Sequence, residues 1–367
     1  MTGAQENLIG ELEKVIAGKE IGHRAVMLRR VTDLFVMGSG RLSDEQIALF
    51  DDVMGCLVEE IEIAARATLG NVLATLADAP PKVVGRLALD DAIDVAGPVL
   101  SHCGRVDDTT LVEGAKTKSQ EHLLAISRRK TLVESVTDIL LERGNQQVVL
   151  STAENLGAAF SEFGYSTLVR RSSSDDYLAA CVWSRPEIPR QHLLKLFVDA
   201  SESVKRELTK KDPGKAGLIL EIVAQATNRI QTRTRERSAR YAAARAHVSS
   251  LHESGKLGEA QLAEFACSEK FDETIVALSM ICDLPVDPIE RAFTDDRSEQ
   301  IIVLAKAAGL SWETTKVILL LQAGTNNAST RKFDRHFETF TQLKGETAKK
   351  ALTFYRMRER AQMPRLN

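Results

Sequence analysis

The segment 229–245 contains six arginines and a single acidic residue, Glu236. A guanidinium group can form paired hydrogen bonds with a carboxylate or a phosphate, so such a segment is suited to binding anions. Four of the arginines would share one face of a continuous helix, because they are spaced by four, four and three residues. We call these four residues the arginine stripe: Arg229, Arg233, Arg237 and Arg240.

Three interpretations of the arginine stripe are open. It is a solvated helix face, or it pairs within the chain with acids such as Glu59, Glu60 and Glu62; it contacts an acidic protein partner; or it contacts the phosphates of nucleic acid. Tyr241 is the only aromatic residue close by, which weakens the case for stacking on single-stranded nucleic acid. A smaller candidate patch consists of Arg128 and Arg129.

The usual catalytic and cofactor-binding motifs are missing from the sequence. It contains no Gly-rich phosphate loop ending in Lys-Ser/Thr, no HExxH, no CxxC and no nucleophile elbow. GSGRLS at 38–43 lacks the third glycine of a dinucleotide loop and is interpreted as a turn between helices. The seven histidines show no metal-ligand spacing. We therefore expect a non-enzymatic protein without a metal or cofactor, and an uncharacterised enzyme is the remaining alternative.

The elements around Arg128 and Arg129 follow the pattern of a helix pair over residues 124–150. Thr131 and Glu134 form a capping box that predicts the start of one helix. Gly144 predicts a left-handed end to the same helix. The second helix of the pair would begin after Asn145.

This pattern recurs along the chain. Ser127, Asn155 and Ser184 occupy equivalent places, with offsets of 28 and 29 residues, and an earlier unit begins near Asp90. Periods of roughly 20–50 residues are typical of stacked repeats, in which each unit covers the apolar face of the next. The sequence therefore predicts an all-α fold that begins with a HEAT-like α-solenoid of short helical hairpins.

The second half of the chain predicts a long helix followed by further helical repeats. Residues 218–254 contain neither glycine nor proline, and a single helix of that length would also offer a surface for self-association. Segments 271–293 and 298–320 superpose at an offset of 26 residues, and Gly309 predicts a left-handed helix end in the second copy. The predicted organisation is a leader and helix at 1–40, a HEAT-like repeat domain at 41–208, a linker at 209–215, the long helix with C-terminal repeats at 216–324, and a polar basic tail with one helix at 325–367.

The composition sets limits on location and partners. The 367 residues carry a net charge of −3, so any attraction to nucleic acid or to a membrane would come from a local patch. No apolar stretch is long enough to span a membrane, and the first 20 residues lack a hydrophobic signal region. Five widely spread cysteines, mostly flanked by apolar residues, favour buried free thiols over a disulfide framework. We therefore expect a cytoplasmic protein that does not bind membranes.

Several segments together resemble a known bacterial family. They are LFDDVMGCLVEEIEIAARATL, the run from Ala79 to Leu100, LAISRR followed by TLVESVTDILLERG, and KAAGLSWETT. As a set they are similar to the family called domain of unknown function 2336, over about Arg24 to Gly324. The resemblance implies a soluble, α-helical, HEAT-like protein and carries over no functional residue.

These observations lead to one functional expectation and one alternative. We expect an interaction scaffold or regulator that binds a protein partner, because stacked helices offer a long surface and no catalytic set is visible. The alternative is nucleic-acid binding through the arginine-rich helix.

Overall fold

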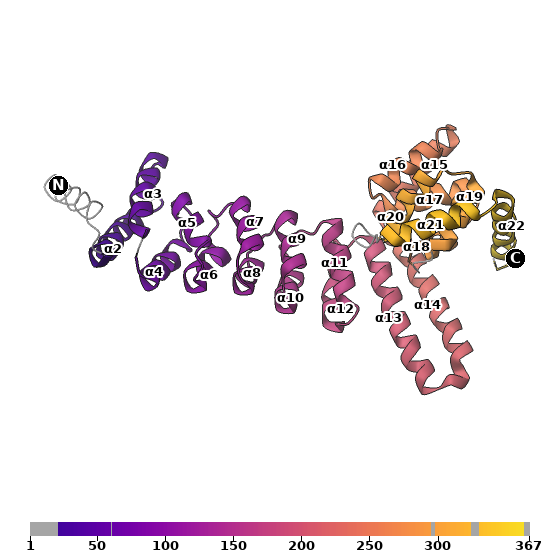
Figure 1. Ribbon diagram of the computed structural model, residues 1–367, viewed down its shortest axis with the longest axis horizontal. Helices are drawn as coiled ribbons and strands as arrows, with labels where there is room; N and C mark the ends of the chain where they lie inside the picture. Colours follow the sequence, from indigo (N-terminus) through magenta and orange to yellow (C-terminus); the bar gives the residue numbers. More distant parts are fainter. Residues whose placement is uncertain (1–20, 60, 295–297, 324–329, 363–367) are drawn as a thin grey trace. The chain divides into compact units, whose positions relative to one another are not determined.

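The computed structural model describes residues 21–59, 61–294, 298–323 and 330–362 (Figure 1). Within these ranges every regular element is a helix, which confirms the prediction of an all-α fold. The predicted leader, residues 1–20, lies outside the described residues. The chain divides into two compact units, Met1–Leu168 and Val169–Asn367.

The first unit is a succession of short helices that contact one another in two rows. One row consists of α3, α5, α7 and α9, and the other of α4, α6, α8 and α10 (Figure 1). Fully buried leucines fill the space between them, including Leu73, Leu100 and Leu140. The helices are α2 (Ile21–Gly38), α3 (Asp44–Val58), α4 (Ile63–Leu73), α5 (Pro81–Ala88), α6 (Ile93–His102), α7 (Asp108–Thr117), α8 (Gln120–Ser127), α9 (Glu134–Arg143) and α10 (Gln146–Glu154), and α11 (Glu162–Ser172) crosses the division between the units.

The predicted spacing of 28 residues corresponds to a physical contact between successive helix pairs. The Asn155 side-chain amide donates hydrogen bonds to the carbonyl oxygens of Ser127 and Arg129, at 2.9 and 2.7 Å. Ser127 lies 28 residues before Asn155, so equivalent positions in neighbouring pairs touch each other. The finer assignment to a HEAT-like solenoid stays a prediction.

Two details predicted for α9 are wrong, and the first follows from a contact with a distant segment. Thr131 does not cap the helix, because Leu132 is held in an isolated bridge with Ala158 and the helix begins only at Glu134. Gly144 is not left-handed, since its φ is −65°. Glycine is needed there for a different reason: a Cβ atom would lie 2.3 Å from the Leu140 carbonyl oxygen. The positive φ of Gly309 is present as predicted, and Ser43 and Gln46 form a capping box at the start of α3.

The second unit combines a long helical hairpin with a compact group of helices. The hairpin pairs α13 with α14, and it extends away from the remaining helices of this unit (Figure 1). Apolar residues of α15–α22 form the core, with Ile275, Leu278 and Ile302 fully buried. The elements are α12 (Asp176–Trp183), α13 (Arg190–Lys211), a 3₁₀ turn (Pro213–Lys215), α14 (Ala216–Arg237), α15 (Ala239–Glu253), α16 (Glu259–Cys267), α17 (Phe271–Cys282), α18 (Val286–Thr294), α19 (Ser298–Ala308), α20 (Trp312–Ala323), α21 (Thr330–Gln342) and α22 (Gly345–Gln362).

The predicted single helix over 218–254 is wrong. It is broken at Ser238, whose extended backbone has φ −89° and ψ 110°. The Ser238 hydroxyl accepts a hydrogen bond from the Tyr241 backbone N–H at 3.1 Å, so serine caps α15 without any glycine or proline. The segment 209–215, predicted as a linker between domains, forms the end of α13 and the turn into α14 inside the second unit.

The C-terminal tail contains two described helices, where the sequence predicted one. α21 was missed, although Phe340 within it is buried in the core of the second unit. α22 packs against α19, and Ala348 is fully buried. The Arg356 guanidinium donates hydrogen bonds to the Cys282 carbonyl oxygen, the shorter at 2.5 Å. The tail is therefore part of the core of this unit.

The five cysteines are free thiols, as expected, but they are not uniformly buried. Cys56 and Cys267 are exposed, whereas Cys103 and Cys282 are buried. Burial raises the pKa of Cys282 to about 12, which keeps its thiolate fraction very low at pH 8.

We expect Ellman's reagent at pH 8 to label Cys56 and Cys267 of the native chain rapidly. Labelling of Cys282 should be slower by at least about 100-fold, because the thiol is both inaccessible and protonated. Mass spectrometry of the labelled peptides at successive times measures this. Unfolding in urea is the control and should make the five rates similar. Rapid native labelling of Cys282 would contradict the packing of α17.

Candidate partner-binding surface

The outer side of α14 carries three exposed arginines. Gln231 and Arg235 are four residues apart and face the protein, with Gln231 fully buried. Arg229 and Arg233 are each two residues from Gln231, and Arg237 is two residues from Arg235. Two residues correspond to a rotation of roughly 200° around a helix, so these three arginines face outward. All three are exposed, and none forms a hydrogen bond or ion pair with a residue that the structure describes. The outer face of α14 is therefore an open cationic surface.

Arg240, the fourth member of the predicted arginine stripe, lies on a different helix. It is the second residue of α15, beyond the break at Ser238. Its side chain is exposed, but the uniform helical spacing that placed it beside the others does not apply across the break. The structure thus supports a common face for Arg229, Arg233 and Arg237 only.

Arg235, which lies between two outward-facing arginines in the sequence, belongs to a buried ionic cluster. Its Nη1 atom donates to Glu290 Oε2 at 2.7 Å, and its Nη2 atom donates to Asp287. Glu290 also accepts a hydrogen bond from Arg190, which pairs with Asp272 at 2.6 Å. We call this set the buried ionic cluster: Arg190, Arg235, Asp272, Asp287 and Glu290.

The buried ionic cluster joins four helices of the second unit. Arg190 opens α13, Arg235 lies on α14, Asp272 on α17 and Glu290 on α18. Burial raises the pKa of Glu290, and the two guanidinium groups oppose this effect. Burial also acts to lower the pKa of Arg235, but its contacts with Asp287 and Glu290 outweigh it, and the pKa is raised. These opposing effects indicate a tightly coupled network with a structural role.

The candidate patch at Arg128 and Arg129 divides into one surface residue and one structural residue. Arg128 is exposed. Arg129 donates from Nη1 to the Leu100 carbonyl at 2.7 Å and from Nη2 to the Cys103 carbonyl at 2.9 Å. Burial lowers the pKa of Arg129. Its guanidinium fork satisfies carbonyl groups at the C-terminal end of α6, which have no partner within the helix.

The same use of arginine recurs elsewhere in the first unit. Arg86 on α5 donates to the Gly55 carbonyl of α3 at 3.1 Å. Arg143 on α9 donates to the carbonyls of Ala115 and Lys118 at the end of α7. In each case the arginine reaches back to the preceding helix of its own row. These arginines therefore hold successive helix pairs together.

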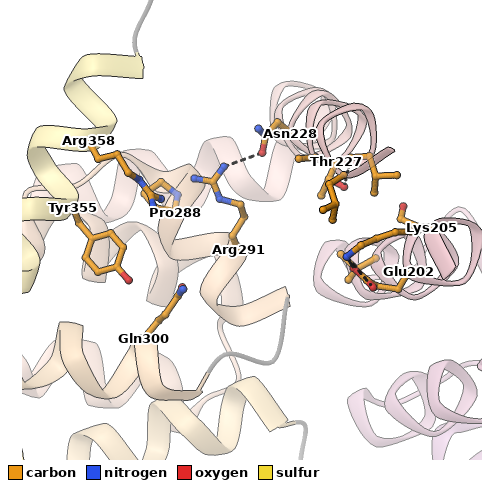
Figure 2. A pocket seen from close by; sticks show the side chains of 14 residues that line it. Glu202, Lys205, Thr227, Asn228, Pro288, Arg291, Gln300, Tyr355 and Arg358 are labelled. Carbon is orange, nitrogen blue, oxygen red and sulfur yellow. Dashed lines mark hydrogen bonds and ion pairs between the residues drawn. The ribbon is translucent and has the colours of Figure 1, made fainter. Parts of the chain in front are cut away.

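A polar hollow of about 390 Å³ lies at the base of the α13–α14 hairpin. Figure 2 shows Arg291 of α18 directed toward Asn228 of α14, and the two form a hydrogen bond of 2.9 Å. On the hairpin side, Lys205 pairs with Glu202 at 2.9 Å. The Arg358 guanidinium on α22 lies 5.6 Å from the centre of the Tyr355 ring. The lining groups thus engage one another and link the hairpin to the rest of the unit.

The histidines that the sequence left without a role include buried structural residues. His122 is 2% exposed, and its ring nitrogens lie 2.8 Å from the Ser119 hydroxyl and 3.0 Å from the Asp90 carbonyl. Within the described residues, no three His, Cys, Asp or Glu side chains are grouped as a metal ion would require. Nor is any described helix both long and apolar enough to cross a bilayer.

The fold and these surfaces define an all-helical protein of paired helices with an exposed cationic helix face. Its sequence matches a family model over residues 95–353. The chain belongs to this family, which is described as an uncharacterised protein conserved in bacteria (DUF2336), and the predicted resemblance is confirmed. Comparison with curated proteins found no match, and neither did comparison with solved structures.

Proposed function

We propose that this chain is a non-enzymatic interaction protein, a scaffold or regulator, that binds an acidic segment of a partner protein along the outer face of α14. The observation that carries the proposal is the exposure of Arg229, Arg233 and Arg237 without a partner among the described residues. Arg235 on the opposite side of the same helix pairs with Asp287 and Glu290. One side of α14 therefore carries an arginine that holds the fold together, and the other side carries arginines that can bind a partner.

The spacing of the three arginines supports an anionic partner. Like charges four residues apart on a helix destabilise it by roughly 0.2–0.5 kcal/mol per pair. Carboxylates placed between the guanidinium groups would remove that repulsion and add charge-assisted hydrogen bonds. An acidic partner would therefore stabilise this face of α14 more than solvent does.

A protein partner fits this surface better than nucleic acid does. Tyr241, the aromatic residue nearest to these arginines in the sequence, is 8% exposed. The Arg190 guanidinium lies 5.0 Å from the centre of its ring, which leaves it unavailable for stacking on a base. Nucleic-acid binding through phosphate contacts alone is the second candidate.

The architecture of the first unit supports the scaffold part of the proposal. Its two rows of helices are compatible with a HEAT-like solenoid, in which stacked pairs present an extended surface. A cytoplasmic location would suit the free exposed thiols of Cys56 and Cys267.

The test is the affinity of the full chain for a fluorescent oligoglutamate peptide of about 12 residues, measured by anisotropy at about 50 mM salt. The triple variant Arg229→Gln, Arg233→Gln, Arg237→Gln should bind at least about tenfold more weakly, because three charge-assisted contacts are lost. A charge-matched control replaces three exposed lysines of the same unit by glutamine: Lys316, Lys344 and Lys349.

The control variant should bind the peptide within about twofold of the natural chain. Equal weakening by both triple variants would mean that only net charge matters, which would contradict the proposal. Tighter binding of a duplex DNA of equal charge, lost in the arginine variant, would favour the second candidate instead.

A further inference from the structure

The outer half of the α13–α14 hairpin carries an uncovered apolar surface. Residues 200–211 of α13 and 216–226 of α14 include no buried side chain. Large apolar side chains that are about half exposed are concentrated there: Val204, Leu208, Leu218, Leu220 and Ile222. Two helices that pack only on each other cannot cover such side chains, since each can bury only one narrow stripe.

Four of these residues lie on one flank of the hairpin. Leu220 lines the polar hollow at the hairpin base, and Leu218 and Ile222 are each two residues away, so they face the opposite side of α14. On α13, Glu202 lines the same hollow, and Val204 and Leu208, one turn apart, lie on the other side of the helix from Glu202. We call the surface opposite the hollow the apolar flank: Val204, Leu208, Leu218 and Ile222.

We propose that the apolar flank is the docking surface for a second copy of this chain, so that two hairpins form a four-helix arrangement. In a four-helix bundle each helix buries an apolar stripe against its neighbours. A twofold axis brings the same patch of both copies together. The apolar flank of one copy would therefore pack on the apolar flank of the other. This inference does not depend on the arginine stripe.

The charge around the apolar flank favours a second copy over a charged partner. The outer part of the hairpin is close to electrically neutral, with four acidic and five basic side chains over residues 200–226. Two of the acids are already paired with bases one turn away, as in Lys205–Glu202 and Lys215–Asp212, both at 2.9 Å. A neutral surface can meet a copy of itself without like-charge repulsion, whereas it offers no attraction to an acidic or basic partner.

The size of the surface fits a weak, reversible dimer. A standard interface takes roughly 20–30 residues from each side. The outer halves of the two helices, 200–211 and 216–226, contain 12 and 11 residues, of which about half lie on the side that carries the apolar flank. Apolar side chains near the middle of an interface dominate its energy.

Sedimentation equilibrium of the full chain tests the proposal. The chain has a mass of 40.3 kDa, and a dimer of twice that mass is expected at about 50 µM. The variant Val204→Ser, Leu208→Ser, Leu218→Ser, Ile222→Ser should sediment as a monomer, with a dissociation constant raised at least about 100-fold. Since all four side chains are exposed, far-UV circular dichroism should show unchanged helix content.

Two further variants make the result specific. Leu218→Glu with Ile222→Glu should also yield a monomer, because four carboxylates would meet across the twofold axis. Phe354→Ser with Met357→Ser removes exposed apolar side chains from α22 and should leave the dimer intact. A natural chain that is monomeric at about 100 µM, or a dimer that survives both substitutions in the apolar flank, would overturn the proposal.

Discussion

Replacement of Arg190 by methionine is expected to destabilise the second unit by about 3–5 kcal/mol. The Arg190 side chain is 5% exposed and pairs with Glu290, whose side chain is fully buried. Methionine fills a similar volume but leaves Glu290 with only Arg235 and leaves Asp272 without its cation. Removing one partner from a buried ion pair is costly because the other charge stays desolvated.

Urea unfolding followed by tryptophan fluorescence measures this effect in the relevant unit. Both tryptophans, Trp183 and Trp312, belong to the second unit, so the signal reports on it directly. The matched control is Arg229→Met on the exposed face of α14, which should change the free energy of unfolding by less than about 0.5 kcal/mol. A loss below about 1 kcal/mol for Arg190→Met would contradict a structural role for the buried ionic cluster.

The neighbouring residues Arg128 and Arg129 should respond very differently to substitution. Arg129→Ala is expected to destabilise the first unit by about 2 kcal/mol, because the carbonyls of Leu100 and Cys103 lose their donor. Arg128→Ala removes an exposed side chain and should cost less than about 0.5 kcal/mol.

Native-state hydrogen exchange distinguishes these two variants without relying on tryptophan. Arg129→Ala should accelerate exchange of the amides in α6 and α8, while those in α17 and α19 stay unchanged. Arg128→Ala should resemble the natural chain throughout. If both variants behaved alike, the guanidinium of Arg129 would not be holding the end of α6.

Local patterns in the sequence were sufficient to predict helices and several of their ends. The capping box at Ser43 and the left-handed Gly309 depend on residues only a few positions apart, and both are present. The division at Ser238 was missed because a serine cap competes with helix continuation, and neither glycine nor proline marks it. Gly144 was predicted to be left-handed, but its φ is −65°, and glycine is needed because a Cβ atom would lie 2.3 Å from the Leu140 carbonyl oxygen of the same helix.

The different roles of the arginines in α14 could not be assigned from spacing alone. Periodicity places Arg235 opposite Arg233, but it does not say which side faces the core. That depends on Glu290, which lies 55 residues from Arg235 and 100 residues from Arg190. Asp287 and Glu290, two acidic residues three positions apart, were the available signal for a buried partner of arginine.

The proposal of an acidic partner on the outer face of α14 is tested most directly by hydrogen–deuterium exchange of the full chain with saturating oligoglutamate peptide. Slower exchange is expected in the segment 229–237 of the natural chain, and no change there is expected in the variant Arg229→Gln, Arg233→Gln, Arg237→Gln. Protection confined to other helices, with the 229–237 amides unaffected in the natural chain, would contradict it.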